Sequence, residues 1–197
     1  ALTVTTTLTN NAGSAGLVIE PGGSLIENNT GVAATVNRSI TGGKWHLVSI
    51  PLTSATAGTF TGDYLQSWSE PTAAWVEIYQ TSTALNPVQG YSLWPVAATS
   101  PGTYAFTGAL NAGEKSITIT CSGASAENNG ANLLGNPYPS SIDWNTVSGY
   151  GAVYIWNGSA YVTYPQSGNY GTGSRYIPPM QGFFVITDVS QIFTLDN

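Results

Sequence analysis

The chain has 197 residues, of which 42% are apolar and only 7% charged, and it carries a net charge of −6 with just four basic residues. Ordinary soluble domains contain about 25% charged residues, so Thr, Ser, Gly, Asn and Tyr must build much of this surface. Nucleic acids and anionic membrane surfaces require basic patches, and a bilayer requires an apolar run of about 18 residues or more. We therefore expect neither nucleic-acid binding nor membrane insertion. The single cysteine excludes an internal disulfide.

The first part of the chain, residues 1–40, differs from the rest in lacking Trp and Tyr. It contains the short strand-like runs "LTVTTTLTN", "GLVIEPGGSLIEN" and "GVAATVNRSI", separated by Gly and Asn. This pattern is typical of β-solenoid rungs, with inward positions at Leu17, Ile19, Leu25 and Ile26. Three rungs are too few to be stable alone. We therefore expect residues 1–40 to continue an upstream solenoid or to pack on the next domain, within a larger multidomain protein.

The remainder, residues 41–197, contains a set of phrases written twice in the same order. "WHLVSIPL" is followed by "WSEPTAAWVEIY", "PVQGYSL" and "YAFT"; later "NLLGNPYP" is followed by "WNGSAYVTY", "PMQGFFV" and "QIFT". The matched prolines are 137 − 51 = 86 residues apart and the matched glutamines 181 − 89 = 92. The sequence therefore predicts an internal duplication, with copy one at 41–125 and copy two at 128–197.

The local composition predicts the fold class. The segments are short, rich in Val, Ile, Thr, Tyr and Trp, and punctuated by 23 Gly and 11 Pro, whereas helical periodicity is nearly absent. We expect an all-β protein: a duplicated, jelly-roll-like β-sandwich preceded by the solenoid-like strands. The Pro-x-Gln-Gly phrases are interpreted as scaffold, because Pro ends a strand and Gly permits a bulge or a close approach. The predicted core residues are Leu47, Trp68, Leu133, Trp156, Phe183 and Val185.

Three stretches of the second copy resemble a known type of protein module. "ANLLGNPYPSSIDWN", "VYIWNGSAYVTY" and "IPPMQGFFV" resemble a β-rich module found near the C-termini of large secreted Bacteroidota proteins, which typically use the type IX secretion system. "GLVIEPGGSLI" resembles the solenoid rungs that precede that module. The resemblance implies a secreted or cell-surface location and no particular activity, because such modules accompany enzymes, adhesins and uncharacterised proteins alike.

Residues for catalysis are scarce. With one histidine, His46 inside a predicted strand, and one cysteine, the usual zinc sites and a Ser-His-Asp triad are not expected. Two carboxylates suffice for glycoside hydrolysis, and Asp63, Glu70, Glu77 and Asp143 are available, but nothing in the sequence places two of them face to face. We expect no enzyme activity and no cofactor. Calcium stays open, since Asp63, Asp143 and Asn145 can offer oxygens, although no EF-hand-like loop is present.

Aromatic residues are the remaining resource, with six Trp and eleven Tyr. Their flat apolar faces and polar edges suit a sugar ring at a wet surface. Copy two has a loop, residues 165–178, that is twice as long as its counterpart at 80–86. Loops held on a rigid scaffold often carry function, and an Arg fork can serve two hydroxyl oxygens. The predicted ligand-binding residues in and around this loop are Tyr170, Arg175, Tyr176, Tyr161, Trp75, Trp144, Asn157 and Gln166.

Three functions follow from this sequence. The first is a non-catalytic extracellular module that binds a polysaccharide or glycan, as an accessory to a polysaccharide-active or surface protein. The alternative is a structural stalk or adhesion module with no ligand. The third is a glycan-active enzyme. Exposed aromatics arranged as a platform favour the first, whereas buried aromatics and an open solenoid end favour the second.

Overall fold

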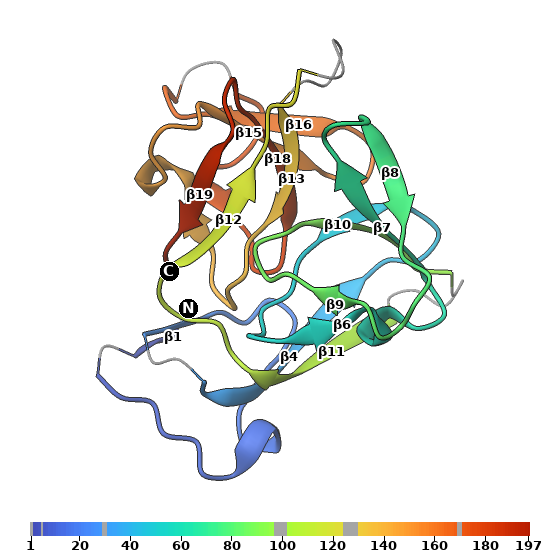
Figure 1. Cartoon of the computed structure of the whole chain (residues 1–197). Helices are drawn as coiled ribbons and strands as arrows, with labels where there is room; N and C mark the ends of the chain where they lie inside the picture. Colours follow the sequence, from blue (N-terminus) through green and yellow to red (C-terminus); the bar gives the residue numbers. More distant parts are fainter. Residues whose placement is uncertain (1, 5, 29–30, 97–101, 124–129, 169–170) are drawn as a thin grey trace.

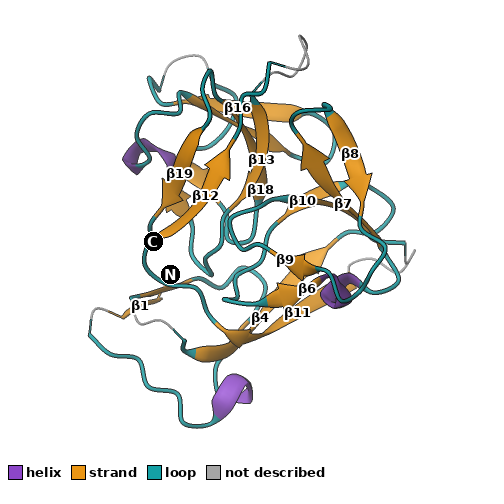
Figure 2. Ribbon diagram, in the orientation of Figure 1, coloured by secondary structure: helices purple, strands orange, loops and turns teal. Residues whose placement is uncertain are grey.

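The computed structural model describes residues 2–4, 6–28, 31–96, 102–123, 130–168 and 171–197, and it confirms the all-β class (Figures 1 and 2). The described residues contain no α-helix, only the single 3-10 turns η1 (Gly13–Ala15), η2 (Ala57–Phe60) and η3 (Trp144–Thr146). Among these residues, no helix has the length and apolarity needed to cross a membrane.

The N-terminal strands pair in parallel. β1 (Leu2–Val4) lies beside β3 (Leu25–Glu27), and β2 (Val18–Ile19) beside β4 (Ala33–Ile40). Parallel stacking of strands is compatible with the predicted solenoid-like rungs. The other edge of β4 pairs antiparallel over eight residues with β11 (Gly102–Ala109). Residues 1–40 are therefore joined to the following part by a continuous hydrogen-bonded ladder (Figure 1).

Two four-stranded antiparallel sheets form the body of the molecule. The first has the order β5-β10-β7-β8, with β5 His46–Val48, β7 Tyr64–Ser69, β8 Ala74–Glu77 and β10 Tyr91–Trp94. The second has the order β13-β18-β15-β16, with β13 Ala131–Gly135, β15 Ala152–Trp156, β16 Tyr161–Pro165 and β18 Gly182–Ile186.

Three strand pairs accompany these sheets. β6 (Ala55–Thr56) pairs with β9 (Ala84–Leu85), β14 (Ile142–Asp143) with β17 (Tyr176–Ile177), and β12 (Lys115–Ile119) with β19 (Gln191–Leu195). We call β4 to β11 the first half and β12 to β19 the second half. Counted in chain order, the pairings of one half correspond to those of the other, since β4–β11 matches β12–β19 and β6–β9 matches β14–β17.

Each half has its own apolar core, and each core receives one side chain from the other half. The first core contains Ile50, Leu93 and Phe106 together with Met180, although Met180 precedes a strand of the second half. The second core contains Phe183 and Phe193 with further residues of its own half, and it also contains Val88 of the first half. Met180 and Val88 both occupy the variable position of the Pro-x-Gln-Gly phrase. The phrase therefore inserts a side chain into the opposite core.

Backbone hydrogen bonds fix this exchange along the seam between the halves. Ser49 N–H donates to the Met180 carbonyl at 3.0 Å, and Gly135 N–H donates to the Val88 carbonyl at 2.7 Å. The next residue of each phrase also bridges the seam, because Gln181 pairs with Val48 and Gln89 with Leu134. The predicted scaffold role of the glutamines agrees with these contacts.

Burial confirms four of the six predicted core residues and corrects the other two. Phe183 and Val185 are fully buried, and Leu47 and Leu133 are nearly so. Trp68 and Trp156 are only half-buried, so assigning them to the core was wrong. The reason is that each indole lies at the outer surface of the seam, where its N–H donates to a carbonyl of the opposite half.

Candidate ligand-binding groove

Two hairpins carry aromatic pairs on directly opposed strands. Trp68 of β7 faces Trp75 of β8, with ring centroids 5.1 Å apart, and Trp156 of β15 faces Tyr161 of β16, also at 5.1 Å. Trp156 and Tyr161 form the last pair of their ladder before the turn, and Trp68 and Trp75 form the last pair but one of theirs. Opposed aromatic residues stabilise an antiparallel pair beyond the area they bury. The sequence thus places an aromatic pair on each half of the molecule.

Phe184 connects the two pairs. It lies on β18 next to the fully buried Phe183, and because side chains alternate along a strand it points to the opposite face. Its ring centroid is 5.5 Å from that of Trp68 and 6.0 Å from that of Tyr161. Tyr154 stands opposite Phe184 in the adjacent ladder. Rings from both halves therefore meet on one face.

These rings line a depression of about 330 Å³, here called the aromatic groove. Its lining residues are Trp68, Trp75, Ala131, Tyr154, Tyr161, Phe184 and Ile186. Hairpin β7–β8, which supplies the two tryptophans, stands beside the β13–β18–β15–β16 sheet in Figure 1. A groove made jointly by both halves can exist only when the seam is assembled.

The rings are held in fixed orientations and remain accessible. The interplanar angles are 70° for Trp68 and Trp75 and 74° for Tyr161 and Phe184, so the rings meet edge to face. Trp68 Nε1 donates to the Ala131 carbonyl at 2.8 Å, which locks that indole. Trp75 and Tyr161 are 37% and 48% exposed. Partial burial raises the pKa of Tyr161, so its hydroxyl stays protonated and can donate a hydrogen bond near neutral pH.

The depth of the groove depends on a small residue. Ala131 and its ladder partner Ile186 form one wall. On the other side of the seam, Trp156 Nε1 donates to the Trp45 carbonyl at 3.1 Å, as Trp68 Nε1 does to that of Ala131. Trp45 therefore corresponds to Ala131, and its indole packs edge to face on Trp94 at 5.4 Å. Ala131 therefore has a methyl group at the position where the first half has the Trp45 indole.

Two of the predicted site residues lie in the groove, and one prediction is corrected. Trp75 and Tyr161 are brought together there, although 86 residues separate them (161 − 75). Trp144 is fully buried in the second core, stacked on Phe193 at 6.4 Å. It cannot extend a surface platform, because η3 directs its ring inward. Tyr170 lies outside the described residues.

The predicted loop residues Arg175 and Tyr176 form a separate cluster. The Arg175 guanidinium makes a bidentate contact with Asp143, with Nε 3.0 Å from Oδ1, and it lies 4.9 Å above the centre of the Tyr176 ring. Hydrogen bonding from Arg175 lowers the pKa of Asp143. Tyr176 is 51% exposed but does not line the groove. The Arg175 fork that sequence reasoning assigned to a sugar therefore holds a carboxylate.

The two predicted amides serve the local backbone. Asn157 Oδ1 accepts from the Ser159 and Ala160 N–H groups at 3.0 and 2.9 Å, which shapes the β15–β16 turn. Gln166 donates to the carbonyls of Trp144 and Val147. Neither residue lines the groove.

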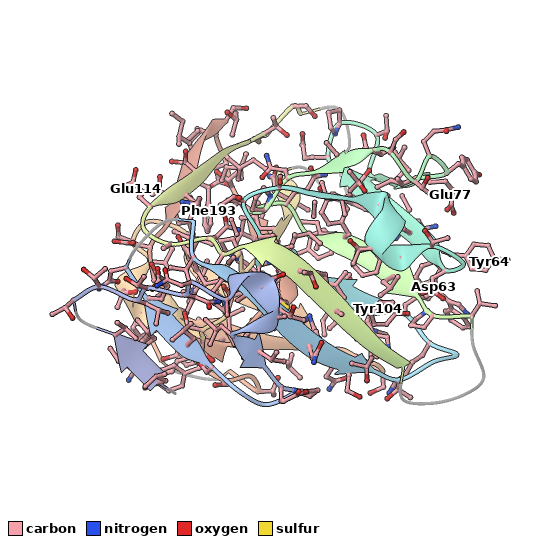
Figure 3. The ribbon with its side chains drawn as sticks, turned by 90° about the horizontal axis from the view of Figure 1, so that it is seen from below. Asp63, Tyr64, Glu77, Tyr104, Glu114 and Phe193 are labelled. Atoms are coloured by element: carbon pink, nitrogen blue, oxygen red, sulfur yellow. The ribbon has the colours of Figure 1, made fainter. Side chains whose placement is uncertain are left out.

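The acidic side chains considered for catalysis or calcium already have protein partners. Asp63 accepts from the Tyr104 hydroxyl at 2.5 Å and from Val96 N–H at 2.9 Å, and Figure 3 shows Asp63 beside Tyr104. Glu77 accepts from Gln66 at 2.6 Å. Within the described part of the chain, no three acidic, His or Cys side chains gather as a metal site.

Glu70 is the buried member of this set. Burial alone would raise its pKa, but hydrogen bonds from the N–H groups of Gly130 and Ser122 and from the hydroxyls of Thr120 and Ser122 outweigh that effect, and the net pKa is lowered. A general acid near neutral pH needs the opposite shift. Glu70 is thus arranged as a structural anion.

Sequence reasoning missed five of the seven groove residues: the wall residues Ala131 and Ile186, and the aromatic residues Trp68, Tyr154 and Phe184. Trp68 was assigned to the core because it matches Trp156, but its opposition to Trp75 across a short hairpin was a usable signal. Phe184 was detectable from the "FFV" run, in which only alternate residues can face the core. Tyr154 had no distinguishing pattern.

Comparison with protein-family models, with curated proteins and with solved structures gives no match for this chain.

Proposed function

We propose that this chain is a non-catalytic, extracellular carbohydrate-binding module, an accessory to a polysaccharide-active or surface protein, whose ligand occupies the aromatic groove. The single observation that carries the proposal is the convergence of Trp68, Trp75, Tyr161 and Phe184 at an accessible surface. Sugar rings present C–H groups on a face and hydroxyls on the rim. Aromatic faces, the Tyr161 hydroxyl and the Trp75 N–H match these two kinds of group. The weakly charged composition supports the same ligand class.

The fold belongs to this proposal as an internally duplicated, jelly-roll-like β-sandwich. Support comes from the equal strand orders and from the reciprocal contacts of Val88 and Met180 with the opposite cores. Duplication explains why Ala131 and Trp45 occupy corresponding places.

The direct test is affinity electrophoresis in gels that contain soluble β-glucan, xylan, mannan or pectin. We expect at least one polysaccharide to retard the wild type, and Trp75→Ala and Tyr161→Ala each to weaken binding about tenfold, since each removes a ring contact. Tyr79→Ala is the matched control, because Tyr79 is 82% exposed and lies outside the groove lining. Retardation by no polysaccharide, or equal retardation of both groove variants and the wild type, would contradict the proposal.

A gain-of-bulk variant gives a complementary test. Ala131→Trp is expected to fill the groove and abolish retardation. Its unfolding midpoint should stay close to that of the wild type, because the corresponding place beside Trp156 already accepts the indole of Trp45. A variant that is folded and still retarded would show that the ligand lies elsewhere.

A structural spacer remains the second candidate function. The parallel pairs β1–β3 and β2–β4 favour it, because stacked parallel rungs can transmit a solenoid into the sandwich. The same gels separate the two: a protein that no glycan retards, with groove variants that behave like the wild type, is the outcome expected of a spacer.

A further inference from the structure

A second depression adjoins the aromatic groove and differs from it in chemistry. It encloses about 380 Å³ and shares Tyr154 and Ile186 with the groove. The rest of its lining comes from the segments 149–152 and 187–191. We call it the polar depression, and its distinguishing residues are Tyr150, Thr187, Asp188, Val189 and Gln191.

Two polar side chains of this depression can receive hydrogen bonds from a ligand. The Thr187 hydroxyl is engaged, since it donates to the Val189 carbonyl at 2.7 Å and accepts from Gln191 Nε2 at 3.0 Å. Gln191 is thereby held in position with its Oε1 available. The carboxylate of Asp188 accepts no hydrogen bond from the described part of the chain, and Asp188 is exposed. Acceptors at such positions suit a ligand that is rich in hydroxyl donors.

The basic residues lie elsewhere. Arg38 donates to the Met180 carbonyl, Lys115 to the Ala112 carbonyl at 2.6 Å, and Arg175 to Asp143. The Lys44 ammonium lies against the β15–β16 turn at Gly158. None of the four lines the aromatic groove or the polar depression. With Asp188 in the polar depression and no basic side chain in the lining of either depression, the surface disfavours carboxylated or sulfated chains.

We propose that the ligand is an extended, neutral glycan chain that stacks in the aromatic groove, crosses Tyr154 and Ile186, and continues into the polar depression, where Asp188 and Gln191 accept hydrogen bonds from its hydroxyls. This inference rests on the proposed function. It adds that the chain interior is bound, rather than a single terminal sugar, because two depressions of different chemistry adjoin along one face.

Isothermal titration calorimetry with oligosaccharides of defined length tests the inference. The probes are disaccharides and hexasaccharides of the gluco, xylo and manno series, with polygalacturonate as the acidic comparison. We expect the best hexasaccharide to bind the wild type at least about tenfold more tightly than its disaccharide, because only the longer ligand reaches both depressions. Polygalacturonate should bind more weakly than the neutral chain.

The variant Asp188→Ala should weaken hexasaccharide binding about fivefold and leave disaccharide binding unchanged. Gln191→Ala provides a second reading of the same depression if Asp188→Ala lowers the unfolding midpoint. Glu114→Ala is the matched control, because Glu114 is an exposed acid that lines neither the aromatic groove nor the polar depression; Figure 3 shows it on the opposite side of the view from Glu77.

The outcomes distinguish the two proposals. Equal affinities for the disaccharide and hexasaccharide, with binding still lost in Trp75→Ala, would overturn the extended chain but leave the carbohydrate-binding function standing. Polygalacturonate binding as tight as that of the neutral chain would overturn neutrality. Binding of no probe at all would contradict the proposed function, and this inference with it.

Discussion

Trp68 of the first half donates its indole N–H to the Ala131 carbonyl of the second half at 2.8 Å, and this bond places an aromatic face over the seam. Trp156 makes the reciprocal bond to the Trp45 carbonyl at 3.1 Å. Both bonds cross the seam in the same way, and Trp68, but not Trp156, lines the aromatic groove. The acceptor residues differ in size: the groove has Ala131, whereas the corresponding residue is Trp45, whose indole packs on Trp94.

The adjacent residues Phe183 and Phe184 should separate stability from binding. Phe183 is fully buried, so Phe183→Ala is expected to lower the free energy of unfolding by about 3–5 kcal/mol. Phe184 is half-buried in the groove, so Phe184→Ala should cost less stability and should remove retardation by polysaccharide. Chemical denaturation and affinity gels measure the two effects. If the two variants lost the same stability and the same retardation, the separate roles of Phe183 and Phe184 would be contradicted.

The seam should not tolerate a side chain at Gly90. A Cβ at that position would come within 2.3 Å of the Leu134 carbonyl oxygen, which belongs to the backbone of the opposite half. Gly90→Ala is therefore expected to lower the free energy of unfolding by about 1–3 kcal/mol. Gly102→Ala is the control, because its Cβ would make only ordinary contacts at 3.8 Å or more. Equal unfolding midpoints for the two variants would show that the seam can move apart.

Glu70 should make stability depend on acidity. Its pKa is lowered in the folded protein, so its contribution is present above the unfolded-state pKa of about 4.3 and is lost as pH falls through the lower folded value. Glu70→Gln is expected to lower the free energy of unfolding at pH 7 by about 2 kcal/mol. Denaturation curves at pH 7 and pH 3 measure this. A deficit that persists unchanged at pH 3 would mean that the charge of Glu70 is not its cause.

The Arg175 cluster should behave as structure rather than as a ligand site. Arg175→Gln removes the partner that lowers the pKa of Asp143, so the pKa of that carboxyl should rise, as measured by carboxyl-carbon NMR titration. Tyr176→Ala should leave polysaccharide retardation unchanged, because Tyr176 does not line the groove. Loss of retardation in Tyr176→Ala would return the loop to the binding surface.

Sequence patterns alone sufficed for the all-β class and for four of the six predicted core residues. Val, Ile, Thr and aromatic residues between Gly and Pro favour strands, and period-two alternation agrees with the burial of Phe183 and Val185 on either side of Phe184. The twice-written Pro-x-Gln-Gly phrase correctly marked scaffold positions. These are local properties, set by backbone sterics and by which residues avoid water.

Only the tertiary structure decided where the groove lies. Trp75 and Tyr161 were both candidates from the sequence, but their proximity depends on two hairpins meeting across a seam, and no local pattern encodes that distance. Trp144 was predicted at the surface but lies in the core, where its ring stacks on Phe193. The long loop at 165–178 was predicted to bind a ligand, but its Arg175 donates hydrogen bonds to Asp143 instead. The sequence specifies which side chain stands at each position, but long-range packing determines which other side chains it contacts. A binding surface depends on those contacts.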